Sequence, residues 1–134
     1  MLCDAGPLVA VIDHSDKNHR RCLAVLGTLR SALVTTWPCF TEAMYLLGRY
    51  GGQPAQEELW SYVQDEIITF HISSPAEQKR MRLLMQKYRD TPMDLADASL
   101  VAAAEFLTEV RIFTTDTDFL FYRIGRNIPF EVLP

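Results

Sequence analysis

Short apolar segments alternate with helical patterns along the whole chain, and this alternation constrains the fold more than any other feature. Runs with strand character cover 1–3, 32–36, 67–71, 110–115 and 130–133. Strands separated by helices pair in parallel, because each helical connection returns the chain to the same end of the sheet. The sequence therefore predicts an α/β domain with three layers, in which a short central parallel sheet carries helices on both faces.

Turn and capping residues mark the helices expected in the first half of the chain. Gly6-Pro7 opens the first helix, and Ser15 and Asp16 are candidate caps of the second. A third helix begins at 36–38 and ends at Gly51-Gly52, and a fourth covers 54–65.

In the second half, Ser74 and Glu77 have the spacing of a capping box. The helix behind them is expected to bury four residues, Met81, Leu84, Met85 and Tyr88. A further helix covers 94–107, and a short helical turn covers 119–122 with Asp118 as its expected cap.

The bulk composition indicates one ordinary globular domain over residues 1–134. Seventeen acidic and thirteen basic residues give a net charge of −4, which argues against a protein that coats nucleic acid through bulk charge but is compatible with a nuclease. No segment has the pattern of a signal peptide or is long and apolar enough to span a membrane. The three cysteines, Cys3, Cys22 and Cys39, lack metal-like spacing, so we expect free buried thiols in a cytoplasmic protein.

Four acidic residues stand out: Asp4, Glu42, Asp97 and Asp116. Each lies at the end of a predicted strand or in the first turns of a predicted helix. The carboxyl ends of parallel strands share one edge of the sheet, so the fold would bring these distant positions together. Clustered carboxylates repel each other unless a cation lies between them. The pattern predicts a divalent-metal site and, with it, phosphodiester chemistry.

The four positions differ in how strongly the residues themselves support this role. Asp97 lies in LADASLVAAAEFL, a helix that is apolar nearly all round, and a buried carboxylate there requires a partner. Asp94 already fills the N-cap position of that helix, so capping does not account for Asp97. Glu42 lies opposite the apolar face 40/43/44/47 of its helix, so an ordinary exposed glutamate is the alternative interpretation.

The segments that carry these residues resemble the PIN-domain nucleases, in particular the VapC-type toxins of toxin–antitoxin pairs. The resemblance covers essentially the whole chain through MLCDAGPLVAVID, the TEA step at 41–43, DLADASLVAAAE and IFTTDTDF. It departs at Ala5-Gly6, where many relatives have a Ser or Thr after the Asp.

The resemblance implies a PIN-like fold and an Mg²⁺- or Mn²⁺-dependent endoribonuclease. Asp4, Glu42, Asp97 and Asp116 would bind the metal and activate water, and the Thr114 hydroxyl would orient the acidic cluster. Asp94 and Asp118 would be secondary members. The resemblance also implies an RNA substrate, a cognate antitoxin that inserts near the acidic cleft, and a homodimer.

Basic residues that could contact RNA fall into three groups: Lys17, Arg20 and Arg21; Lys79, Arg82 and Arg89; Arg123 and Arg126. Each group is also explained as a solvated surface. Arg49 is the preferred contact to RNA or to an inhibitory partner, because it lies on the same helix side as Glu42. The histidines His14, His19 and His71 lack ligand spacing and are interpreted as surface or structural residues.

Two other classes of function remain open from the sequence. A catalytically silent RNA- or protein-binding module could use the same fold, although the intact set of four acids favours an enzyme. A different Mg²⁺ enzyme is less consistent with the residues. A haloacid-type phosphatase needs an Asp where this chain has Gly6, and a receiver domain needs a late lysine, whereas no lysine follows Lys87.

Overall fold

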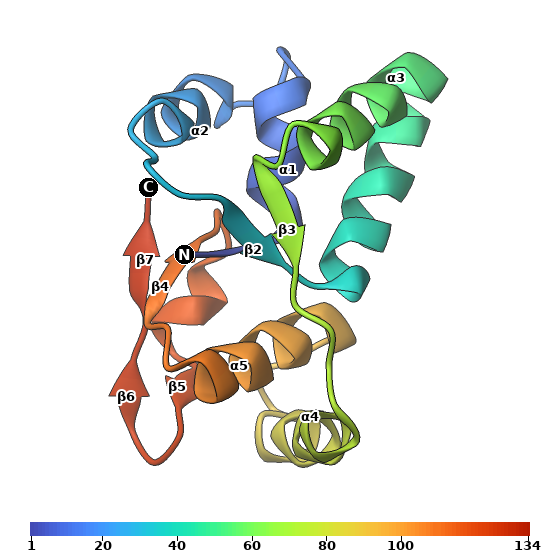
Figure 1. Ribbon diagram of the computed structural model, residues 1–134. Helices are drawn as coiled ribbons and strands as arrows, with labels where there is room; N and C mark the ends of the chain where they lie inside the picture. Colours follow the sequence, from blue (N-terminus) through green and yellow to red (C-terminus); the bar gives the residue numbers. More distant parts are fainter.

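The computed structural model describes residues 1–134 and shows a three-layer α/β fold (Figure 1). The central sheet contains five short strands: β1 (Leu2–Cys3), β2 (Leu33–Thr35), β3 (Ile68–Phe70), β4 (Arg111–Phe113) and β7 (Glu131–Leu133). Their order is β3-β2-β1-β4-β7, and every neighbouring pair is parallel. The predicted fold class is therefore confirmed.

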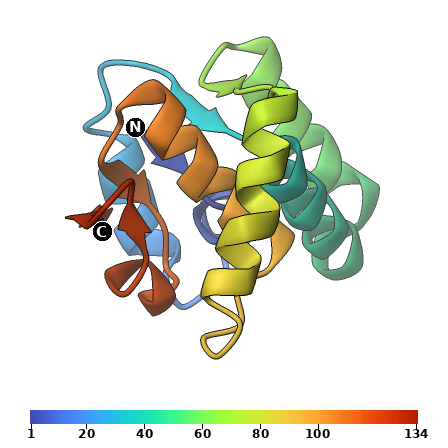
Figure 2. The same ribbon diagram turned by 90° about the horizontal axis from the view of Figure 1, so that it is seen from below.

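The helices are α1 (Ala5–Ile12), α2 (His19–Leu26), α3 (Trp37–Gln64), α4 (Pro75–Lys87) and α5 (Leu95–Leu107), with a 3-10 turn η1 (Thr117–Leu120). Helices α1, α2 and α3 cover one face of the sheet, and α4 and α5 cover the other; α4 and α5 lie side by side in both views (Figures 1 and 2). None of the helices combines the length and the apolar character needed to cross a lipid bilayer.

Alternation of side chains along the strands divides the core into two parts. Leu2 and Ile112 pack with α4 and α5, whereas the next residues along each strand, Cys3 and Phe113, pack with α1, α2 and α3. Successive residues of a strand point to opposite faces, so two-residue and three-residue strands suffice to fill both cores. The three cysteines are free and buried, as expected.

Helix α3 is continuous in outline but is interrupted at Gly52, whose φ of 68° is left-handed. Pro54 follows two residues later and cannot donate the backbone hydrogen bond of a regular helix. The two helices predicted on either side of Gly51-Gly52 are therefore present, joined through a kink rather than a loop.

The second half of the chain follows its predicted capping residues. Ser74 and Glu77 form both hydrogen bonds of the capping box, and Asp94 accepts the backbone N–H of Asp97.

Several local predictions are wrong. Helix α2 begins at His19 after Asn18, because Asp13 and Asp16 instead accept backbone N–H groups within the preceding turns. Met85 is exposed, because it lies on the outer side of α4. The chain also forms a small antiparallel hairpin, β5 (Arg123–Ile124) with β6 (Ile128–Pro129), that the sequence analysis did not predict.

Candidate active site

A hollow of about 390 Å³ opens where the chain leaves the carboxyl ends of β1 and β4. We call it the acidic hollow. It is lined by Asp4, Ala5, Gly6, Glu42, Asp94, Asp97, Thr115, Asp116 and Thr117. The four predicted site residues therefore line one hollow, together with Asp94.

Asp4 follows β1 directly and caps α1. Its Oδ1 accepts the backbone N–H of Ala5 at 2.7 Å, and its Oδ2 accepts the hydroxyl of Thr114 at 2.7 Å. The Asp4 backbone N–H donates to the Phe113 carbonyl, which extends the pairing of β1 with β4 by one bond. Both carboxylate oxygens and the backbone N–H of Asp4 are thus hydrogen-bonded, and its side chain is buried in the hollow.

Thr114 also positions Asp116. Its Oγ1 accepts the backbone N–H of Asp116 at 3.0 Å while its hydroxyl donates to Asp4. Asp116 Oδ1 in turn accepts the N–H of Asp118 and caps η1. The expected cap at Asp118 is therefore wrong: the cap lies two residues earlier, because the 3-10 turn begins at Thr117.

Asp97 lies in the first turn of α5, where Asp94 occupies the cap position. The Asp97 N–H donates to Asp94 Oδ1 at 2.8 Å, so the Asp97 carboxylate is not itself needed as a cap. Its Oδ2 accepts the hydroxyl of Tyr122 at 3.1 Å. Both Asp97 and Asp4 are only 7% exposed, which agrees with the burial predicted for Asp97 from its apolar helix.

Glu42 reaches the hollow from α3. Phe40, Ala43 and Leu47 on the same helix are buried, and Glu42 is exposed on the opposite side, as its position in the helix predicts. The hollow thus receives side chains from α1, α3, α5 and the segment after β4.

Burial and mutual repulsion disfavour charge on these carboxylates. Burial raises the pKa of Asp97 to about 7, and the neighbouring Asp94 and Asp4 add to the rise, against the hydrogen bond from Tyr122. Burial also raises the pKa of Asp4, opposed by the hydrogen bonds from Thr114 and Ala5. Although Glu42 is largely exposed, partial loss of solvent around its carboxylate raises its pKa, and the charges of Asp4, Asp94 and Asp116 raise it further. The carboxylates therefore destabilise one another.

No lysine or arginine lines the acidic hollow, and none of the ion pairs in the structure involves its carboxylates. A site with five carboxylates and no basic side chain suits a hard divalent cation, for which carboxylate oxygens are preferred ligands. No three His, Cys, Asp or Glu side chains form a ready-made metal cage. Mg²⁺ fits such an open arrangement, because it retains several water ligands and needs few carboxylates.

The remaining predicted residues lie at different distances from this centre. Thr114 is buried and bonded to Asp4, whereas Asp118 does not line the hollow. Arg49 is exposed on α3 two turns beyond Glu42 and is not among the lining residues, so its contact with RNA or a partner stays a prediction.

Two features of the site are not indicated by any pattern in the sequence. Tyr122 lies on the chain just after η1, and only tertiary packing brings its hydroxyl to Asp97. Gly6 is the second feature, because a Cβ built there would lie 2.4 Å from Thr115 Oγ1. The departure at Ala5-Gly6 noted in the sequence therefore accompanies a close approach between α1 and the segment after β4.

Comparison with known proteins identifies the fold. No protein-family model matches the chain, and no curated protein matches its sequence. Among solved structures, the chain is similar to VapC20 of Mycobacterium tuberculosis, a toxin described as cleaving the sarcin–ricin loop, with a TM-score of 0.81 and 13% sequence identity. The match covers 87% of this chain and 90% of VapC20. The chain therefore has the fold of a VapC-type PIN domain.

Proposed function

We propose that this protein is an Mg²⁺- or Mn²⁺-dependent endoribonuclease and the toxin of a toxin–antitoxin pair. The observation that carries the proposal is the acidic hollow, where Asp4, Glu42, Asp97 and Asp116 from four parts of the chain meet without a basic residue. The similarity to VapC20, itself described as a toxin that cleaves the sarcin–ricin loop, supports a nuclease on the shared fold.

In this proposal the four carboxylates hold the metal ion, which supplies positive charge to the scissile phosphate and makes a nearby water more acidic. The other residues position the carboxylates. Thr114 fixes Asp4 and the backbone of Asp116 relative to each other, and Tyr122 fixes one oxygen of Asp97. Asp94 holds the first turn of α5, and thereby the direction in which Asp97 projects. Preorganised side chains of this kind lower the reorganisation needed during reaction.

We also propose that a cognate antitoxin binds this protein. A cytoplasmic toxin has to be silenced by its antitoxin, and a segment that enters the acidic hollow would block RNA directly. We also infer a homodimer, on the resemblance to VapC-type toxins. Size-exclusion chromatography with light scattering tests the oligomeric state independently of activity.

The activity is tested by incubating purified protein with RNA in Mg²⁺, in Mn²⁺ and in EDTA. Cleavage is expected only with a divalent ion. Asp97→Asn should abolish cleavage while circular dichroism and thermal unfolding show a retained fold. Asp90→Asn provides the matched control, because Asp90 is exposed, makes no hydrogen bond or ion pair, and lies outside the hollow.

Cleavage by Asp97→Asn at the parent rate would show that the proposed mechanism is wrong. RNA binding without cleavage by the parent, under every metal condition, would instead favour the silent binding module. An adjacent reading frame that encodes a small DNA-binding protein would support the toxin assignment over a housekeeping nuclease.

A further inference from the structure

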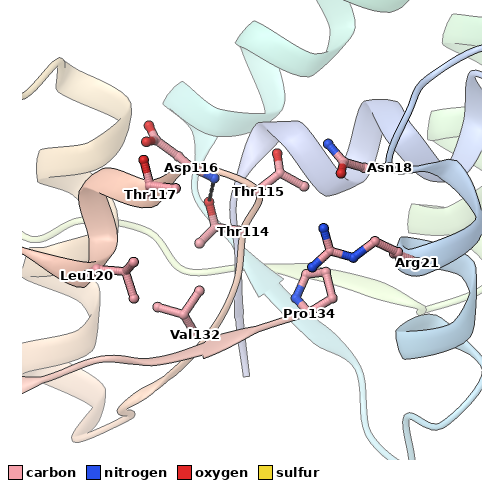
Figure 3. A pocket seen from close by; sticks show the side chains of 9 residues that line it. All are labelled: Asn18, Arg21, Thr114, Thr115, Asp116, Thr117, Leu120, Val132 and Pro134. Atoms are coloured by element: carbon pink, nitrogen blue, oxygen red, sulfur yellow. Dashed lines mark hydrogen bonds between the residues drawn. The ribbon is translucent and has the colours of Figure 1, made fainter.

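A second hollow, which we call the polar pocket, adjoins the acidic hollow. It has a volume of about 260 Å³ and shares Thr115, Asp116 and Thr117 with the acidic hollow. Figure 3 shows Asp116 on one side of the pocket and two side chains from the α2 region, Asn18 and Arg21, on the other. The polar pocket is therefore continuous with the proposed catalytic site but carries the cation that the acidic hollow lacks.

Four of the side chains around the polar pocket have no hydrogen-bond or ion-pair partner within the protein. Arg21 makes no ion pair and no hydrogen bond, although the chain is rich in acidic residues. The side chain of Asn18 precedes α2 without forming a capping hydrogen bond. The hydroxyls of Thr115 and Thr117 also make no hydrogen bond. A guanidinium, an amide and two hydroxyls are thus available to one ligand.

Apolar side chains form another part of the wall. Leu120 and Val132 lie along the side below Asp116 and Thr117, away from Asn18 and Arg21 (Figure 3). A ligand that fits has an anionic group for Arg21 and a less polar body for this wall. A guanidinium binds phosphate oxygens with two parallel hydrogen bonds, so phosphate is the anion that Arg21 suits best.

A nucleotide combines these two properties, and its neighbour along an RNA strand would lie at the acidic hollow. We propose that the polar pocket binds the nucleotide next to the scissile bond, with its phosphate held by Arg21 and Asn18 and its sugar and base against Leu120 and Val132. This inference rests on the proposed nuclease function and adds the residues that hold the substrate strand. Arg21 is a substrate-binding residue in this assignment, whereas the sequence placed it with Lys17 and Arg20 in one of three basic groups that could contact RNA.

The matched pair Arg21→Gln and Arg20→Gln tests this assignment. The two arginines are adjacent and exposed on the same helix, but only Arg21 lines the pocket. Binding is measured by fluorescence anisotropy with a labelled 12-nucleotide single-stranded RNA and Mg²⁺, each variant being made in the Asp97→Asn protein so that the RNA stays intact. Arg21→Gln should weaken binding about tenfold and Arg20→Gln less than about twofold, and Arg21→Lys should restore part of the loss.

Salt dependence supplies a second readout. The slope of log K against log salt is negative, and loss of one phosphate contact to single-stranded RNA makes it less steep by about 0.7. Arg21→Gln is expected to show this shallower slope, and Arg20→Gln is expected to keep the slope of its parent. In the catalytically intact protein, Arg21→Gln should raise KM by about the same factor with little change in kcat.

The outcomes separate this inference from the proposed function. Unchanged RNA affinity and KM in Arg21→Gln, with cleavage retained, would overturn the pocket assignment and leave the nuclease standing. Equal losses in Arg21→Gln and Arg20→Gln would also overturn it, because they would show a diffuse charge effect. Arg21-dependent RNA binding by a protein that cleaves nothing would support the pocket and remove the nuclease. Binding of inorganic phosphate or mononucleotide, but not RNA, would overturn the assignment to a substrate strand.

Discussion

The hydroxyl of Thr114 donates a hydrogen bond of 2.7 Å to Asp4 Oδ2, and so joins two residues that lie 110 positions apart in the chain. The same oxygen accepts the backbone N–H of Asp116 at 3.0 Å. One buried side chain thus connects the ends of two neighbouring parallel strands, β1 and β4, and sets the relative positions of two carboxylates of the acidic hollow.

Replacing this hydroxyl should therefore affect cleavage more than folding. Thr114→Val keeps the side-chain shape but leaves the buried Asp4 carboxylate with one donor fewer, which typically costs about 1–3 kcal/mol. We expect a folded protein with a lower Tm and at least about tenfold slower RNA cleavage, since Asp4 and Asp116 lose their common partner. Thr114→Ser retains the hydroxyl and should recover most of the rate. Equal rates for Thr114→Val and Thr114→Ser would contradict the positioning role.

The raised pKa of Asp97 predicts an unusual dependence of stability on pH in metal-free protein. Asp97 titrates near 7 in the folded state, against an ordinary value of 3.8. A raised folded-state pKa means that the native state binds this proton more tightly than the unfolded state does. The resulting contribution to the free energy of unfolding is fully present below about pH 3.8 and is lost as the pH rises through about 7. In EDTA, the contribution of Asp97 should make the protein less stable at pH 7.5 than at pH 5.5.

Asp97→Asn removes the titrating group and keeps nearly the same volume. The variant should show a smaller loss of Tm between pH 5.5 and 7.5, and at pH 7.5 it should be more stable than the parent by a few degrees. Differential scanning fluorimetry at a series of pH values measures both effects. A parent and variant with parallel Tm curves would show that Asp97 does not carry the predicted charge penalty.

Binding of a divalent metal ion should offset the loss of stability that the charged Asp97 carboxylate causes. A ligand that binds only the folded state stabilises it by RT ln(1 + [L]/Kd), which is about 2.7 kcal/mol at 100 times Kd. At pH 7.5, Mg²⁺ or Mn²⁺ should therefore raise the Tm of the parent, and Asp4→Asn and Asp97→Asn should lose most of this rise. NaCl at equal ionic strength is the control. An identical rise with NaCl would indicate general screening of charge and no specific site.

The convergence of Asp4 and Asp116 was predictable because it depends on topology alone. Asp4 and Asp116 follow β1 and β4, and parallel pairing brings the ends of those strands to one edge whatever the details of packing. Asp97 was predictable for a different reason. A carboxylate in an otherwise apolar helix has to be buried with it, and the residue is indeed buried at the hollow.

Other relationships depend on distances that a sequence pattern does not encode. The hydrogen bond from Tyr122 to Asp97 requires the segment after η1 to pack against α5. The β5–β6 hairpin consists of two-residue strands, which are too short for an alternation to be recognised, although Gly125 marks its turn with a φ of 56°. The cap at Asp116 was missed because Asp-Thr-Asp offers two candidate caps for one short turn, and only the backbone distinguishes them.

The substitution Gly6→Ala distinguishes a steric effect from a helix preference, because α1 approaches Thr115 closely at Gly6. Glycine loses more backbone entropy than alanine when it enters a helix, so Gly6→Ala in the first turn of α1 should stabilise the helix if space were free. A Cβ at Gly6 would instead lie 2.4 Å from Thr115 Oγ1, and Thr115 lines both the acidic hollow and the polar pocket. Thr115 is exposed and its hydroxyl makes no hydrogen bond, so its side chain has to rotate or shift to admit the added Cβ, and this displacement opposes the gain.

We therefore expect Gly6→Ala to be less favourable for the free energy of unfolding in the parent than in Thr115→Ala, where the clashing oxygen is gone. Chemical denaturation of the four proteins of this double-mutant cycle measures this difference. Cleavage should also fall several-fold in Gly6→Ala, because Thr115 has to rotate or shift within the site. Gly27→Ala is the comparison, since its Cβ would meet no atom closer than 3.4 Å. An effect of Gly6→Ala that is the same in both backgrounds would show that Thr115 does not set the requirement for glycine.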